Sequence, residues 1–237
     1  MHFAPDSEET LEFAVELANT RPEASRSGED ELATITQLDA FLDGWRYTGR
    51  RDHDERELRE VRETRDVLPR LWKLGTDDAV VIINRMLSDG RALPYLYRHD
   101  GSPWHLHATD LDAPLAERIG VEIALALVDV IRSGETNRLR VCEADDCDGL
   151  FVDFSRNGSK RFCSVRCGNR MNMIAFRERQ AAEDDPRWAA GASLRRSRDR
   201  RIAAGQVTMS AISTPADAPT EFARMSRGSL TRLGMNC

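Results

Sequence analysis

Four of the five cysteines in the chain lie in one short segment, "VCEADDCDGLFVDFSRNGSKRFCSVRCGNR", which spans residues 141–170. The first two are separated by four residues and the last two by three, and fifteen residues lie between the pairs: Cys142, Cys147, Cys163 and Cys167. Thiols spaced in this way could form two disulfides, work as a redox centre or bind one metal ion.

The spacing favours zinc. Two close pairs joined by a short loop suit a tetrahedral ion, because each pair can hold the metal from one side. A unit of about 40 residues buries too little surface to fold unaided, and structural zinc contributes on the order of 10–16 kcal/mol to such folds. Four thiolates leave no position open for water, so we expect one structural, non-catalytic zinc per chain. Cys237 has no partner nearby and is interpreted as incidental.

Short elements must position these cysteines. "LRVC" before the first pair predicts a strand, and "CSVRCGNRMNMIAFRERQ" predicts a helix. Within such a helix Cys163 and Cys167 would be four residues apart and on one face. Phe151, Phe154 and Phe162 are expected to supply a small apolar core for this unit.

Basic side chains surround the cysteines. Residues 155–180 carry seven basic groups and one acid, Glu178, which favours an anionic partner over pairing within the segment. Arg is well shaped for bidentate recognition of phosphate or guanine. The predicted nucleic-acid contacts are Arg156, Lys160, Arg161, Arg166, Asn169, Arg170 and Arg177.

Two of these residues have open alternatives. Asn169 could read adenine or could bond backbone groups of the metal loop. Arg170, next to the last cysteine, could contact DNA or could brace the thiolates and carbonyls of the zinc site.

The remaining sequence predicts a helical first domain. Four stretches show the periodicity of helices. The first is "SEETLEFAVELANTRP", with Asp6 or Ser7 as its cap, and two others are "TITQLDAFLDGW" and "DDAVVIINRMLSD". The remaining one, "DHDERELREVRETRDVLPRLWKL", is expected to be kinked or ended by Pro69. "ALPYLYRHDGSPWHLHAT" alternates as a β-hairpin does. "DAPLAERIGVEIALALVDVIRSG" predicts a long helix capped by Asp110 or Asp112.

The composition, 41% hydrophobic and 31% charged, is that of a globular protein, with a net charge of −6. No apolar stretch approaches the roughly 20 residues that span a bilayer, and the N-terminus lacks the features of a signal peptide. We therefore expect a cytoplasmic protein, with no membrane partner, in a compartment that keeps thiols reduced.

An enzyme is the weaker class. The sequence contains no nucleophile elbow, phosphate-binding glycine loop or His-Glu-x-x-His pair. His105 and His107 share a strand face and could line a ligand pocket, but a half-exposed hairpin surface is the more common setting. Asn19 is expected to satisfy backbone groups at the end of its helix.

The segment "CGNR" at 167–170, with "CEADDCDGLFVDFSRNGSKRFCS" before it and "AFRER" after it, resembles the CGNR zinc-finger family. The stretches "LEFAVELANTR", "DELATITQLDAFL" and "LPYLYRHDGSPWHLHATDLDAPLAERIGVEIALALVDVI" resemble the ABATE domain of stress-induced transcription regulators. The family's usual basic residue two places after the CGNR arginine is replaced here by Asn172. The resemblance implies a bacterial DNA-binding regulator.

Together these observations predict an α+β protein. Residues 1–136 are expected to form an ABATE-like, mostly helical domain with one hairpin, and residues 138–181 a treble-clef-like or zinc-knuckle unit of short strands and a helix. Residues 182–237 are expected to be a disordered basic tail. The predicted function is DNA-binding transcription regulation, in which the first domain senses a small-molecule signal or dimerises. The alternative is a zinc-clipped protein-interaction or ligand-sensing module that binds no DNA.

Overall fold

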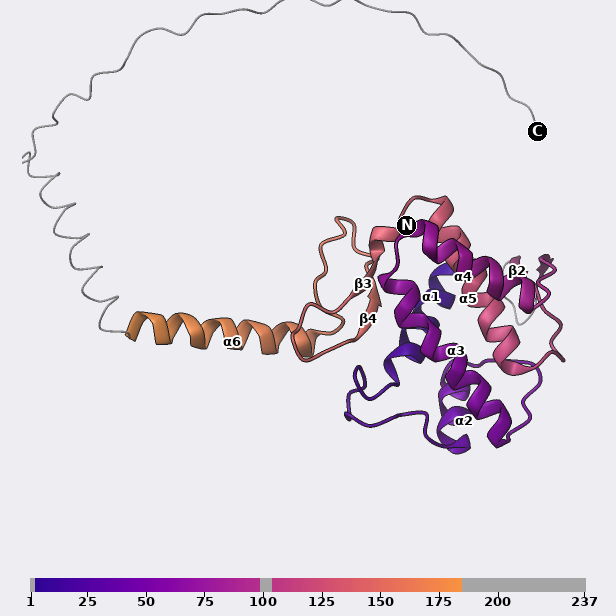
Figure 1. Ribbon diagram of the computed structural model, residues 1–237, viewed down its shortest axis with the longest axis horizontal. Coiled ribbons are helices and arrows are strands. Elements are labelled where there is room, and N and C mark those ends of the chain that lie inside the picture. Colours follow the sequence, from indigo (N-terminus) through magenta and orange to yellow (C-terminus); the bar gives the residue numbers. More distant parts are fainter. Residues whose placement is uncertain (1–2, 99–103, 185–237) are drawn as a thin grey trace, which may run out of the picture. The chain divides into compact units, whose positions relative to one another are not determined.

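The computed structural model describes residues 3–98 and 104–184 (Figure 1). Its described elements follow the chain in this order: α1 (Pro5–Asn19), α2 (Ile35–Gly44), α3 (Glu55–Lys73), α4 (Thr76–Asp89), β1 (Tyr95–Tyr97), β2 (His105–His107), α5 (Leu115–Arg132), the 3-10 turn η1 (Thr136–Arg138), β3 (Leu139–Val141), β4 (Leu150–Val152) and α6 (Val165–Asp184). The predicted α+β class, with a mostly helical first part and short strands near the cysteines, is confirmed.

Helix α5 lies at the centre of the helical body and packs against α1, α3 and α4. Its sequence is amphipathic, with charged residues confined to one side, and its apolar side chains at helical spacing, such as Ile119, Ile123 and Leu127, are almost fully buried. Each such side chain contributes about 1.5–3 kcal/mol through burial. This shared core fixes the helices that surround it.

The helix starts differ in part from those predicted. Asp54 caps α3 by accepting the Glu57 N–H, and Thr34 forms a capping box at the start of α2. The caps predicted for α1 (Asp6 or Ser7) and α5 (Asp110 or Asp112) are wrong, because neither helix has a side-chain cap. Prolines stand at these two starts instead, where a missing N–H costs nothing.

Helix α3 runs through Pro69 and ends only after Lys73. Of the two outcomes predicted for this proline, ending the helix is therefore wrong. Tertiary packing holds the last turn in place, since Leu71 and Trp72 are both buried in the core.

The first hairpin pairs β1 with β2 in antiparallel register, with Tyr95 opposite His107 and Tyr97 opposite His105. The hairpin is confirmed, while its predicted His-Asp-Gly-Ser turn lies outside the described residues.

The second hairpin, β3 and β4, joins the cysteine segment to the helical body. Leu150 and Val152 of β4 belong to the same buried cluster as α1 and α5, and the Trp72 indole donates a hydrogen bond to the Phe151 carbonyl. The expectation that Phe151, Phe154 and Phe162 together supply a small core holds only for Phe162, which belongs to a small cluster around the cysteines. Phe154 packs on the helical core and touches the Phe3 ring, and Phe162 packs on the cysteines.

In the described residues, no helix is both long and apolar enough to cross a membrane. The predicted disordered tail falls almost entirely on residues 185–237, which lie outside the described part of the chain. The division at residues 136 and 181 stays a prediction.

Candidate metal centre and its basic surroundings

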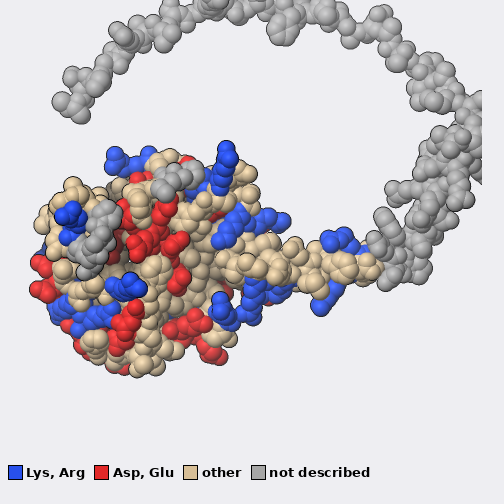
Figure 2. Space-filling model, turned by 180° about the vertical axis from the view of Figure 1, so that it is seen from behind, with Lys and Arg blue, Asp and Glu red and all other residues tan. Residues whose placement is uncertain are grey.

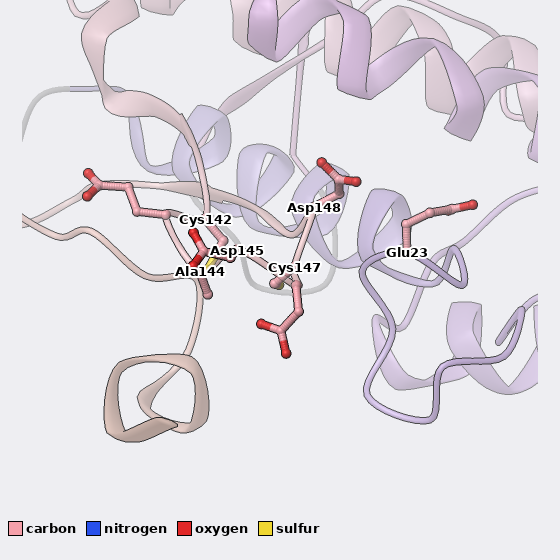
Figure 3. A pocket seen from close by; sticks show the side chains of 8 residues that line it. Glu23, Cys142, Ala144, Asp145, Cys147 and Asp148 are labelled. Atoms are coloured by element: carbon pink, nitrogen blue, oxygen red, sulfur yellow. The ribbon is translucent and has the colours of Figure 1, made fainter. Parts of the chain in front are cut away.

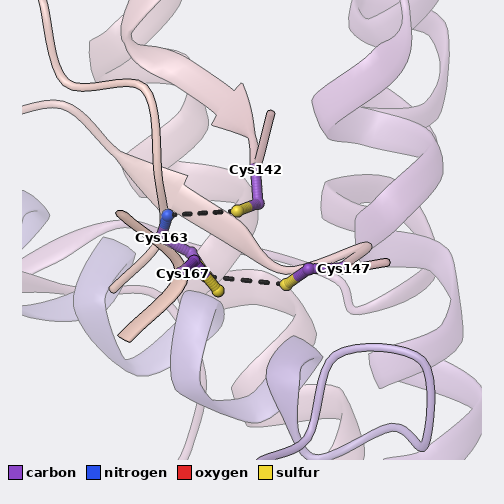
Figure 4. A group of neighbouring side chains, drawn as sticks. All are labelled: Cys142, Cys147, Cys163 and Cys167. Atoms are coloured by element: carbon purple, nitrogen blue, oxygen red, sulfur yellow. Dashed lines mark hydrogen bonds between the residues drawn. The ribbon is translucent and has the colours of Figure 1, made fainter. Parts of the chain in front are cut away.

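The two hairpin strands and the last helix bring the four cysteines together. Cys142 follows β3 directly, Cys147 lies in the turn before β4, and Cys167 lies in the first turn of α6. Backbone hydrogen bonds shape the loop between β3 and β4. The Cys142 N–H donates to the Gly149 carbonyl, and the Cys147 N–H donates to the Ala144 carbonyl. The side chains point toward a common centre (Figure 4).

The sulfur positions match a tetrahedral metal. All four Sγ atoms lie within 4.8 Å of one another. The distances from Cys163 Sγ to Cys147 Sγ and to Cys167 Sγ are both 3.7 Å. A tetrahedron with Zn–S bonds of about 2.3 Å has edges of about 3.8 Å, whereas a disulfide would bring sulfurs to about 2 Å. The four-thiol set therefore fits one structural zinc.

One detail of the predicted site is wrong. Cys163 lies in a bend two residues before α6, so Cys163 and Cys167 are not neighbours on one helix face. The Ser164 hydroxyl accepts the Cys167 N–H at 3.2 Å, which is how a capping residue starts a helix. This cap holds Cys167 at the helix start, next to the Cys163 thiol.

Backbone amides support the sulfurs. The N–H groups of Cys163 and Gly149 point at Cys142 Sγ and Cys147 Sγ, at 3.5 and 3.4 Å. A Cβ atom on Gly149 would lie 2.9 Å from Cys163 Sγ and 3.1 Å from Cys147 Sγ. Only glycine leaves the sulfurs room to converge here.

Burial raises the pKa of two of the four thiols, Cys147 and Cys163. Burial, followed by the neighbouring groups Cys142 and Cys147, raises the pKa of the Cys163 thiol well above its ordinary value. Burial also raises the pKa of Cys147. A metal that binds four thiolates must displace these protons, so its binding weakens as the pH falls.

Arg170 touches the metal centre. Its side chain is about two-thirds buried, and its guanidinium forms an ion pair with Asp146 and lies 3.7 Å from Cys167 Sγ through the same nitrogen. Its Nε is buried without a hydrogen-bond partner among the described residues. This is the geometry of a group that holds the thiolate and the cysteine loop together.

The other predicted contacts are exposed, but two carry internal partners. Arg161 pairs with Glu143 at 2.6 Å, and Arg166 donates to the Arg26 carbonyl at 3.2 Å. Glu178 is the single acid within residues 155–180, and acids from outside the segment also reach it, because Glu143 pairs with Arg161 and Asp146 pairs with Arg170. Lys160 lies over the Phe151 ring, 5.2 Å from its centroid.

Arg156, Asn169 and Arg177 are also exposed. Neither arginine forms an ion pair with any side chain in the described residues. Figure 2 shows Lys and Arg side chains around the finger and along α6, and patches of Asp and Glu on the helical body.

An acidic hollow lies beside the thiols. It measures about 470 Å³ and is lined by the cysteine loop, residues 142–148, together with Glu23 (Figure 3). Four of the loop's lining side chains are acids, among them the Arg161 partner Glu143 and the Arg170 partner Asp146. The loop thus supplies negative charge on one side of the metal centre.

Asp153 is a residue whose role the sequence left unassigned. It is fully buried, and its two oxygens accept the Ser155 N–H at 2.9 Å and the Lys160 N–H at 2.7 Å. These bonds shape the loop that carries Arg156 and Lys160. Burial alone would raise the pKa of Asp153, but the hydrogen bonds from Ser155 and Lys160 lower it overall. The sequence signal was an acid between two aromatic residues, "FVDF".

Comparison with known families agrees with this architecture. Residues 11–134 match the family model ABATE, described as "Putative stress-induced transcription regulator", and residues 138–180 match the CGNR zinc finger. The first match covers just over half of the chain, so the chain belongs to the ABATE family. No curated protein matches it. The two families and the four-cysteine cluster together indicate a zinc-binding regulator, and neither family is described as an enzyme.

Proposed function

We propose that the chain is a transcription regulator that binds duplex DNA through its zinc finger and the first turns of α6. The observation that carries this proposal is the set of exposed cations around the metal centre, of which Arg156 and Arg177 have no ion-pair partner in the described part of the chain. Exposed arginines beside a rigid metal site suit phosphate and guanine.

The metal centre supplies the rigidity. Zinc holds the start of α6 through Cys167, and the chain leading from the loop at residues 153–160 is tied to the cysteine loop by the Glu143 N–H, which donates to the Arg161 carbonyl. Cys142, Cys147, Cys163 and Cys167 act as the ligands, and Arg170 braces Cys167. Arg156, Lys160 and Arg161 then contact phosphates.

Helix α6 offers further contacts. Arg166, Asn169, Met173 and Arg177 recur at helical spacing, and all four are exposed. The Asn169 amide matches the edge of adenine, and an apolar side chain such as Met173 can contact a thymine methyl. This face reads sequence, while the loop side chains position the finger on the backbone.

The helical ABATE domain receives the signal in this proposal, through a small molecule or a second copy of the chain. Regulation of stress genes follows the family description. We place the protein in the bacterial cytoplasm, where DNA is accessible and thiols stay reduced.

Fluorescence anisotropy with zinc-loaded, full-length protein and a pool of random duplex DNA tests the proposal. Phosphate contacts make the logarithm of affinity fall with the logarithm of salt concentration, with a slope of about −0.9 per contact. Arg166→Ala and Arg177→Ala should each weaken binding roughly fivefold or more. Arg85→Ala changes an exposed arginine on α4 and should have no effect. Absence of salt-dependent binding by wild-type protein would refute the proposal.

A protein-interaction module is the second candidate, and the first hairpin favours it. Leu93, Leu96 and Trp104 are 76%, 65% and 64% exposed, and Leu106 is 47% exposed. Large apolar side chains gathered in this way are typical of an interface. If the protein binds no DNA, loss of self-association in Leu96→Ser, measured by light scattering, would support this candidate.

A further inference from the structure

We propose that His105 and His107 form a second metal site, which binds a divalent transition ion such as Ni²⁺ or Zn²⁺ on the first hairpin. The site lies in the helical domain, apart from the four cysteines, and does not depend on DNA binding.

The strand geometry brings the two imidazoles together. Alternate residues of a strand face the same side, so the His-Leu-His sequence of β2 places both rings on one face. The two Nε2 atoms are 3.0 Å apart. Two nitrogens bound to one ion at about 2.05 Å lie about 2.9 Å apart at a right angle and about 3.3 Å apart in a tetrahedron. The observed distance lies between these values.

A carboxylate lies next to His107, one of the two proposed ligands. Glu122 of α5 places Oε1 at 3.7 Å from His107 Nδ1, and its Oε2 accepts the Tyr47 hydroxyl at 2.8 Å. The negative charge near Nδ1 favours the tautomer with its proton there, which leaves the Nε2 lone pair for a metal. Metal-binding histidines are commonly oriented and made more basic in this way.

Aromatic rings limit the motion of the pair. The Tyr95 ring stacks on His107 at 6.3 Å between centroids, and the Tyr97 ring meets it edge-on at 5.8 Å. Tyr95 is itself held by a hydrogen bond to the Thr109 carbonyl. The His105 side chain is partly exposed and the His107 side chain is 14% exposed, so the pair is held in place and is still within reach of solvent.

The ligand set defines the chemistry. Imidazole suits nickel, copper and zinc and disfavours magnesium and calcium. The proposed ligands are the two Nε2 atoms, and the site is distinct from the cluster of four converging thiols. A bound ion would complete its coordination with water or with a donor atom from a small molecule.

Isothermal titration of full-length protein, preloaded with one equivalent of zinc, with Ni²⁺ at neutral pH tests the proposal. Wild-type protein should bind one Ni²⁺, and His105→Gln and His107→Gln should each weaken binding at least tenfold. Glu122→Gln should weaken it severalfold while Ni²⁺ still binds. His53→Gln is the matched control, because His53 is more than half exposed and pairs with Asp39 away from the hairpin.

A second measurement needs no variant. Carbethoxylation of the wild-type histidines, followed by mass spectrometry, should show that Ni²⁺ protects His105 and His107 but not His53. Melting temperatures and zinc content show whether each variant is folded. Equal Ni²⁺ affinity in the His105→Gln/His107→Gln double variant, or no protection of the pair, would mean that the two rings only share a hydrogen bond and would overturn the proposal.

Discussion

The Asn19 side chain holds the backbone of Leu150, 131 residues further along the chain, through two hydrogen bonds. Its Oδ1 accepts the Leu150 N–H at 2.8 Å and its Nδ2 donates to the Leu150 carbonyl at 2.9 Å. In an antiparallel pair, alternate residues direct their backbone groups away from the partner strand. The Cys142 N–H donates to the Gly149 carbonyl, and the Asp153 N–H donates to the Arg138 carbonyl. In this alternating pattern the backbone groups of Leu150 point away from β3. Asn19 therefore replaces a neighbouring strand and fastens α1 to the zinc finger.

Asn19→Ala should destabilise the protein markedly. It would leave the N–H and C=O groups of a fully buried residue without partners, at a cost of roughly 1–3 kcal/mol for each group. Urea unfolding followed by circular dichroism measures the loss. Asn172→Ala changes an exposed residue of α6 and should have little effect. Equal stability of the two variants would contradict the clamp.

Replacing a single cysteine should remove the metal. Cys163→Ser exchanges a soft thiolate for a hydroxyl, and the zinc content should fall from about one per chain to near zero. The helical body should remain folded but less stable, because Leu150 and Val152 form part of its core. Elemental analysis and thermal unfolding test both points. Cys237→Ser, at a position outside the described residues, should keep its zinc.

Gly149→Ala should weaken zinc binding without changing any ligand. The added methyl group would press on Cys163 Sγ and Cys147 Sγ and force the sulfurs apart. We expect at least a tenfold loss in zinc affinity, measured by competition with a chromophoric chelator. Gly44→Ala places its methyl group in open space in α2 and should leave the affinity unchanged.

Arg170 and Arg166 should behave differently. Arg170→Ala removes the contacts with Asp146 and Cys167 Sγ, so it should lower zinc affinity and DNA affinity together. Arg166→Ala should lower DNA affinity alone. Parallel chelator competition and DNA anisotropy separate these outcomes. Full retention of zinc affinity by Arg170→Ala, with DNA binding lost, would make Arg170 a DNA contact.

Asp30 should make stability depend on pH. Burial alone would raise its pKa, but hydrogen bonds from Arg65 and the Leu32 N–H lower it overall. An acid whose pKa is lower in the folded state stabilises the protein above its unfolded value, near pH 4, and loses that contribution as the pH falls through the folded value.

Asp30→Asn should therefore cost about 2 kcal/mol at neutral pH, because it leaves the Arg65 side chain, 3% exposed, with Asp66 as its remaining carboxylate partner. The difference in the free energy of unfolding between the variant and wild type should stay constant between pH 7 and about pH 5 and should shrink below about pH 4. Urea unfolding at several pH values measures it. Asp52→Asn, at an exposed pair with Arg50, should show a much smaller difference. A constant difference down to pH 3 would contradict this assignment.

Local patterns were sufficient to predict much of the molecule. The periodicity of α1–α5, the alternation of the first hairpin and the spacing of the cysteines gave correct elements and the ligand cluster. Contacts between distant residues were not predictable, because no local pattern encodes them. That Asn19 would bond Leu150, that Asp146 would pair with Arg170 and that the two histidine rings would meet all depend on how separate elements pack.

The placement of β4 in the helical core has a consequence for synthesis on the ribosome. Residues of α1 emerge first, yet the surface they bury against Leu150 and Val152 is made more than a hundred residues later. Contacts between residues so far apart in the sequence form slowly, and the helices expose apolar surface until β4 completes their core. The helical body thus cannot reach its final packing until the first half of the finger has been translated, and zinc capture and completion of the core fall at the same late stage.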